Sequence, residues 1–204
     1  MIYIPTENEL NKQKSLIGEF VIRFEQICAL IRLMILEVCY PNYTKLQNNN
    51  TETLLEGLTS DPLRKKLEAL IYDNFPNDDE MLLLNKKISD KFNKIIPIRN
   101  SIAHGSMLMG WKNFKGELSA DTFLLKHSKT TKKGIDRNSK IINIKSIEKL
   151  IKQINWIDIY YSTLYILIDR NKTKKDKEQY LNRLKKDIDK IGKIELDFDY
   201  KINK

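Results

Sequence analysis

The sequence predicts an all-α protein with a small β insert, and three observations support this class. Its 204 residues include only 7 Gly and 5 Pro, too few for the many tight turns of an all-β fold. Apolar residues make up 41% and charged residues 31%, a balance typical of a folded chain with a buried core. Apolar side chains also recur at helical spacing over long stretches. The length fits one domain, which we place over residues 1–204.

Helix start and stop signals divide the chain into six predicted helices. Thr6 and Glu9 form a capping-box pattern, in which each side chain satisfies a free backbone amide of the other residue. Ser60 followed by Pro62 is a second strong start signal, and Gly105 stands where a helix typically ends. The predicted helices cover approximately residues 7–38, 52–58, 60–74, 80–104, 146–169 and 174–191, and residues 41–50 are predicted to be a loop.

Residues 105–145 have a different character and are predicted to form a strand-rich, basic insert. Eight basic and three acidic side chains give residues 112–140 a net charge of +5. Residues 128–139 are predicted to be a basic turn between the last two strands, so the insert contains a small β-hairpin. The predicted strands cover residues 107–111, 121–127 and 140–144.

The net charge favours a polyanionic partner. Lys and Arg number 36 against 27 Asp and Glu, which leaves +9 at neutral pH, and RNA or DNA is the commonest partner of so basic a chain. The chain is also rich in Lys, Asn and Ile, a compositional bias that raises the charge whatever the function. Residues 170–204 are predicted to be a basic C-terminal helix and tail. Their charged face is either a phosphate track or an ordinary solvated surface.

The sequence lacks the signals of membrane insertion, secretion and metal binding. The most apolar stretch is interrupted by charges such as Arg23 and Arg32, so no run of about 18 uncharged residues could span a bilayer. The N-terminus does not read as a secretory signal, and no CxxC or HxxxH spacing occurs. We therefore expect a cytoplasmic protein without membrane contact, metal site or cofactor.

Residues 99–105, RNSIAHG, are the one segment whose side chains together could carry out a reaction. Asn100 and His104 stand four residues apart, about 40° around a helix, so their side chains can touch. Arg99 lies about 140° from His104 and needs its length, or the helix end, to reach the same point. Pro97 removes an amide and is expected to kink the helix just before this segment.

This combination of residues suits the cleavage of RNA. An imidazole titrates near neutral pH, so His104 can take a proton from a 2′-hydroxyl or give one to a leaving 5′-oxygen. The guanidinium of Arg99 can hold the phosphate and stabilise the charge that grows on it. The bare residues equally fit a plain helix end, because a His before Gly often serves only to cap the helix.

The segment Arg99-Asn100-x-x-x-His104 at the end of an apolar helix resembles the R-x4–6-H motif of the HEPN superfamily. The order of elements over about residues 10–190 resembles HEPN proteins of the abortive-infection kind, although only the motif is specific. The resemblance implies a HEPN-type helical bundle and a metal-independent endoribonuclease, usually a homodimer in which two motifs face each other. It implies that Arg99 and His104 are the catalytic pair and that Asn100 orients the histidine or contacts phosphate. It also implies a toxin or effector in antiphage defence or a toxin–antitoxin pair.

Further candidates surround this motif. Glu25 falls inside the apolar stripe of the first helix, where an unpaired charge is costly, so it either orients Arg99 or His104 or lies at the stripe's edge in water. The expected partners are RNA, a second copy of the chain, and an antitoxin, a regulatory RNA or a phage trigger. The rival interpretation is a non-catalytic helical module that binds RNA or protein. Candidate RNA contacts are Lys126, His127, Lys132, Lys133, Lys174 and Lys175.

Overall fold

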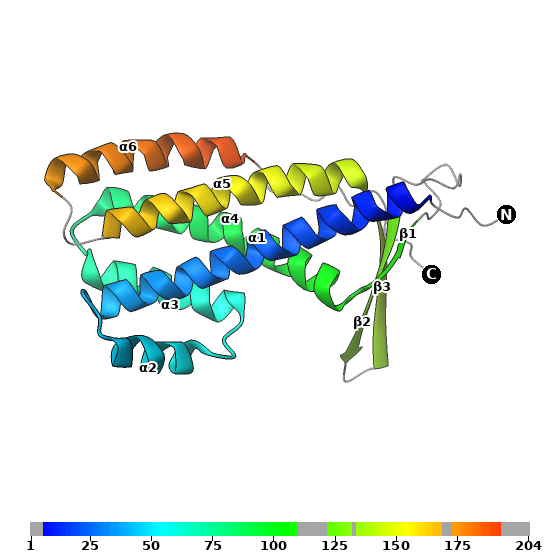
Figure 1. Ribbon diagram of the computed structural model, residues 1–204, viewed down its shortest axis with the longest axis horizontal. Helices are drawn as coiled ribbons and strands as arrows, with labels where there is room; N and C mark the ends of the chain where they lie inside the picture. The colour runs from blue at the N-terminus through cyan, green and yellow to red at the C-terminus, as the bar shows by residue number, and fades with distance from the viewer. Residues whose placement is uncertain (1–5, 110–121, 132–133, 169–172, 193–204) are drawn as a thin grey trace. The chain divides into compact units, whose positions relative to one another are not determined.

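The computed structural model describes residues 6–109, 122–131, 134–168 and 173–192 (Figure 1). Most of these residues are helical, which confirms the predicted helical class. No helix in the described ranges is long and apolar enough to cross a bilayer. The helices are α1 (Glu7–Cys39), α2 (Lys45–Leu55), α3 (Ser60–Asn74), α4 (Asp79–His104), α5 (Ile144–Ile168) and α6 (Lys174–Ile191). The strands are β1 (Ser106–Met109), β2 (Thr122–Thr131) and β3 (Gly134–Asn143).

The chain divides into two compact units, and three helices contribute residues to both. Unit 1 consists of Met1–Ile22, Pro97–Lys152 and Ile194–Lys204, and unit 2 consists of Arg23–Ile96 and Gln153–Lys193. The divide falls within α1, α4 and α5. The sheet and the end of α4 that carries the motif belong to unit 1, whereas α2, α3 and α6 belong to unit 2.

Unit 2 contains a row of buried aromatic side chains. Phe24 stacks on Phe92 with ring centroids 5.1 Å apart, and Phe92 meets Tyr161 edge-to-face at 5.9 Å. Tyr161 contacts Tyr160 in the same manner at 6.2 Å. Burial raises the pKa of both tyrosines well above the usual range, so their hydroxyls stay neutral. Because the row draws on α1, α4 and α5, it fastens these three helices together within unit 2.

A buried arginine joins α3 to α4 in unit 2. Nη1 of Arg64 donates to Oγ of Ser89 at 2.6 Å and to Oε2 of Glu68 at 3.1 Å. Nη2 donates to Oδ1 of Asp61 at 2.8 Å, and the Ser89 hydroxyl donates to Glu68 at 2.8 Å. Two carboxylates thus compensate a guanidinium that is almost wholly removed from water.

The start of α2 corrects the predicted loop over residues 41–50. The helix begins at Lys45, because Thr44 and Gln47 form a capping box that the Asn-rich sequence conceals. The Gln47 amide donates to Oγ1 of Thr44 at 3.3 Å, and the Thr44 amide donates to Oε1 of Gln47 at 2.8 Å. The helix ends at Leu55, three residues before the predicted end, and Gly57 follows with a φ of 74° that favours glycine.

The sheet of unit 1 is antiparallel and has the order β1-β2-β3. The β2–β3 ladder runs from the pair Thr122–Asn143 to the pair Thr131–Gly134. The predicted turn over residues 128–139 is therefore wrong, because residues 128–131 and 134–139 pair with each other in the ladder. Backbone hydrogen bonds set this pairing, so a Lys-rich segment can form strands despite its charge.

Apolar side chains near the start of α5 form a core in unit 1. β3 leads directly into α5, and the residues on both sides of the junction are buried. The motif end of α4 contributes Ile98 and Ile102, which are also buried. These two side chains fix the rotation of the helix end that carries the motif. The buried apolar residues of unit 1 include Phe20, Ile98, Ile102, Ile142, Ile144, Ile147, Leu150 and Ile151.

Candidate functional site

The candidate motif occupies the last turn and a half of α4. The helix continues through Pro97 and ends at His104. Ile98 and Ile102 lie on its buried side, as the sequence suggests, but Ala103 is exposed rather than buried. At 100° per residue, Asn100 and His104 fall on the side opposite these isoleucines. Both side chains are exposed, so a ligand in solvent can reach them.

Arg99 lies at the flank of this exposed side. Its side chain is half-buried, and its Nη1 donates to Oδ1 of Asn100 at 3.4 Å. The sequence pairs Asn100 with His104 or with phosphate, whereas this bond pairs its oxygen with the arginine. The hydroxyl of Ser101 donates to the carbonyl oxygen of Pro97 at 2.9 Å. Ser101 thus bonds back to the helix backbone.

The sheet brings one predicted RNA contact close to the motif along the backbone. β1 begins at Ser106, two residues after His104, and Ser106 pairs with Lys126 of β2. Lys126 also pairs with Ser139, and the neighbouring His127 pairs with Asn138. This register places Lys126 in the strand beside the end of the motif helix, within unit 1. Lys132 and Lys133 lie outside the described residues.

The structure agrees with one of the two positions that the sequence left open for Glu25. Its side chain on α1 is exposed, whereas Phe24 beside it is buried. An exposed carboxylate agrees with the alternative at the edge of the stripe, and the role of Glu25 in orienting Arg99 or His104 stays a prediction. The apolar stripe of α1 is narrower than the sequence pattern suggests at this point, since Ala29 is exposed as well.

The two candidates at the C-terminal end of the chain fall on α6. Lys174 is the first residue of this helix, and Lys175 is exposed on it. Lys175 lines a groove with Arg183 and Lys190, which the sequence analysis did not single out. Their spacing along α6 can be recognised in the sequence, but it does not reveal which residues of another helix lie opposite them.

The described residues contain no group of three or more His, Cys, Asp or Glu side chains placed to hold a metal ion. No protein-family model, curated protein or solved structure matches the chain. The resemblance to HEPN proteins therefore rests on residues 99–104 and on the order of the elements around them.

Proposed function

We propose that this protein is a metal-independent endoribonuclease of the HEPN type that acts as a homodimer. The observation that carries the proposal is the grouping of Arg99, Asn100 and His104 at the end of α4, with Asn100 and His104 exposed and Arg99 beside them. Ile98 and Ile102 are buried in unit 1, and their burial fixes the position of the helix end that carries the three side chains. The register of the sheet pairs Lys126 with Ser106, two residues after His104.

The proposed reaction is an internal transfer at phosphorus. The 2′-oxygen of RNA forms a bond to the adjacent phosphorus, and the bond from phosphorus to the 5′-oxygen breaks. His104 accepts the proton of the 2′-hydroxyl, and the partner's His104 donates a proton to the leaving 5′-oxygen. Arg99 holds the phosphate and stabilises its growing charge. The products are a 2′,3′-cyclic phosphate and a free 5′-hydroxyl.

The same resemblance suggests the cellular role. We propose that the enzyme is a toxin or effector in antiphage defence, either in abortive infection or in a toxin–antitoxin pair. Its activity would then be restrained by an antitoxin or a regulatory RNA, or switched on by a phage trigger. Expression in bacteria followed by capture of cyclic-phosphate ends would identify the RNA that is cut.

The test compares His104→Ala and Arg99→Ala with wild type in a cleavage assay that contains EDTA. Each change should reduce the rate by about 10²- to 10⁴-fold, because each removes a group that acts on the reacting phosphate. Lys94→Ala is the matched control, since it removes an exposed positive charge from the same helix outside the motif. Wild-type rates in both motif variants, with cyclic-phosphate ends still formed, would contradict the proposal.

The rival function is a non-catalytic module that binds RNA or protein, and the basic surface of α6 favours it. On that reading no cyclic-phosphate end forms under any condition, and binding of RNA survives His104→Ala. Wild-type protein that stops bacterial growth and generates such ends, when the His104→Ala variant does neither, would exclude the rival.

A further inference from the structure

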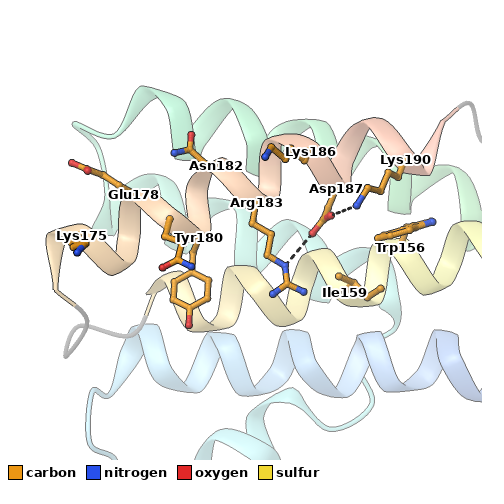
Figure 2. A pocket seen from close by; sticks show the side chains of 11 residues that line it. Trp156, Ile159, Lys175, Glu178, Tyr180, Asn182, Arg183, Lys186, Asp187 and Lys190 are labelled. Carbon is orange, nitrogen blue, oxygen red and sulfur yellow. Dashed lines mark hydrogen bonds and ion pairs between the residues drawn. The ribbon is translucent and has the colours of Figure 1, made fainter.

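A groove of about 860 Å³ lies between α5 and α6 in unit 2 (Figure 2). Four cationic side chains of α6 line it, together with Trp156 of α5. The amide side chains of Gln179 and Asn182 line it as well. The cations are Lys175, Arg183, Lys186 and Lys190.

Helical periodicity explains why these cations share one side of α6. Residues 175, 179, 182, 183, 186 and 190 recur at intervals of three and four, which is one face of a helix. The opposite face is apolar and buried through Leu184 and Ile188. Lys185, next in sequence to Lys186, lies off the groove and forms an ion pair with Glu80 of α4.

Two carboxylates line the groove: Glu178 is exposed, whereas Asp187 is buried beneath the cations. Only 5% of the side chain of Asp187 is exposed, against 60% for Arg183 and 49% for Lys190. Oδ1 of Asp187 is 3.0 Å from Nζ of Lys190, and Oδ2 is 3.6 Å from Nε of Arg183 (Figure 2). Near Asp187, a ligand in the groove therefore meets Arg183 and Lys190 and not the buried carboxylate.

Trp156 fixes one of these cations further. Nζ of Lys190 lies 4.3 Å from the centroid of the Trp156 ring, a cation–π contact. Lys190 is thus held from two sides, by the carboxylate of Asp187 and by the indole. Side chains that are already held lose less entropy when an anion binds, so the arrangement is preset for a negative ligand. An ordinary solvated lysine face has no such supports.

The remaining cations are available to that ligand. Within the described residues, neither Lys175 nor Lys186 forms an ion pair, and both are exposed. The ion pair of Arg183 uses Nε, which leaves its two terminal nitrogens to hold a phosphate. At 1.5 Å per residue, the cations from Arg183 to Lys190 extend over about 10 Å of α6. A row of this length suits successive phosphates of one strand.

We propose that the α5–α6 groove binds the phosphate backbone of single-stranded RNA at a site separate from the cleavage motif. The choice of RNA over another polyanion rests on the proposed function, and it is supported by the aromatic side chains of Trp156 and Tyr180 among the cations. Grooves that combine cations with aromatic rings are typical of single-strand binding.

The test uses full-length protein that carries His104→Ala, so that RNA binds without being cut, and Trp111→Phe, so that Trp156 is the remaining tryptophan. Oligouridine is titrated, and both its fluorescence anisotropy and the Trp156 emission are followed. We expect Lys186→Ala to weaken binding about threefold to tenfold and to lower the salt dependence by about one phosphate contact. Lys185→Ala, the matched change one residue away, should alter affinity less than about twofold.

Several results would contradict the proposal that the groove binds RNA. Equal weakening by Lys185→Ala and Lys186→Ala would show a diffuse charge effect, and unchanged Trp156 emission at saturation would place the RNA elsewhere. Polyglutamate that binds as tightly as oligouridine would point to an acidic protein partner, and uridine monophosphate that binds when oligouridine does not would point to a free nucleotide. Lys186→Glu, with an unchanged melting temperature, provides a second variant for the same comparison.

The proposal that the groove binds RNA and the nuclease proposal can be contradicted separately. If wild-type protein never cuts RNA but Lys186→Ala still weakens binding, the nuclease proposal is wrong and the groove stands. If wild-type protein cuts RNA and Lys186→Ala leaves both affinity and Trp156 emission unchanged, the groove is wrong and the nuclease proposal stands.

Discussion

Two arginines, Arg64 of α3 and Arg99 of α4, differ in the burial and hydrogen bonding of their side chains. Arg64 is 7% exposed and reaches two carboxylates and the Ser89 hydroxyl, with its shortest bond at 2.6 Å. Arg99 is half-buried, its bond to Asn100 is 3.4 Å long, and the neighbouring His104 is exposed. Short charge-assisted bonds fix the side chain of Arg64 for stability, whereas Arg99 stands beside exposed polar groups that a ligand can reach.

The first prediction tests this comparison through stability. Arg64→Leu should lower the free energy of unfolding by about 1–3 kcal/mol, because Glu68 and the buried Ser89 lose a partner. The loss stays below that of a wholly buried ion pair, since about a third of the Glu68 side chain is exposed. Arg99→Leu should lower the free energy of unfolding by less than Arg64→Leu does, because Arg99 is only half-buried whereas Arg64 is 7% exposed. Urea unfolding followed by circular dichroism measures both.

The same pair should separate in the cleavage assay. Arg64→Leu protein that remains folded should cut RNA at close to the wild-type rate, whereas Arg99→Leu should not. If Arg99→Leu lowers the free energy of unfolding as much as Arg64→Leu does, Arg99 also contributes to stability. The contrast drawn between the two arginines would then be wrong.

A second, smaller effect concerns the two capping boxes of unit 2. Thr173 caps α6 through Asp176, with bonds of 3.2 Å in both directions between the amide of one residue and the side-chain oxygen of the other. Thr173→Ala should cost about 1 kcal/mol of stability, and so should Thr44→Ala, which removes the equivalent cap of α2. Only Thr173→Ala should speed amide hydrogen exchange in the first turn of α6, next to Lys175 of the groove. Equal exchange in both variants would show that the cap does not order this end of the groove.

Sequence reasoning succeeded where a local signal defines an element. The helices over residues 60–74 and 80–104 were predicted to within a residue at each end, because Ser60 with Pro62 and Gly105 mark their limits. It failed at α2, where an Asn-rich run disguised a capping box, and at residues 128–139, where charge concealed a strand ladder. The first failure was a missed side-chain cap, and the second arose because backbone pairing between strands outweighed the charge of the side chains.

The sequence predicts only the part of the candidate site that lies on a single helix. The grouping of Arg99, Asn100 and His104 follows from their spacing, and the structure places them on one helix end. The exposure of Glu25 stayed open, because it depends on how wide the buried stripe of α1 is. The groove could not be predicted, because the support of Lys190 comes from Trp156 on another helix. Contacts between helices can be predicted only when the fold is known.

The smallest predicted effect is a pH dependence that belongs to Arg64 and not to Arg99. The pKa of Asp61 is lowered, first by its hydrogen bond to Lys65 and then by its bond to Arg64. A carboxyl group whose pKa is lower in the folded than in the unfolded chain contributes stability at neutral pH. That contribution is lost as the pH falls below about 4 and through the folded pKa.

Asp61→Asn should therefore flatten the fall of the urea midpoint between about pH 7 and pH 3, by a small amount because a third of the side chain is exposed. Asp73→Asn, an exposed change on the same helix, is the control and should leave the acid slope unaltered. Arg64→Leu should flatten the slope in the same direction, since it removes one cause of the low pKa. Arg99→Leu leaves Lys65 and Arg64 beside Asp61, so this variant should keep the part of the acid slope that Asp61→Asn removes, and loss of that part would contradict the assignment.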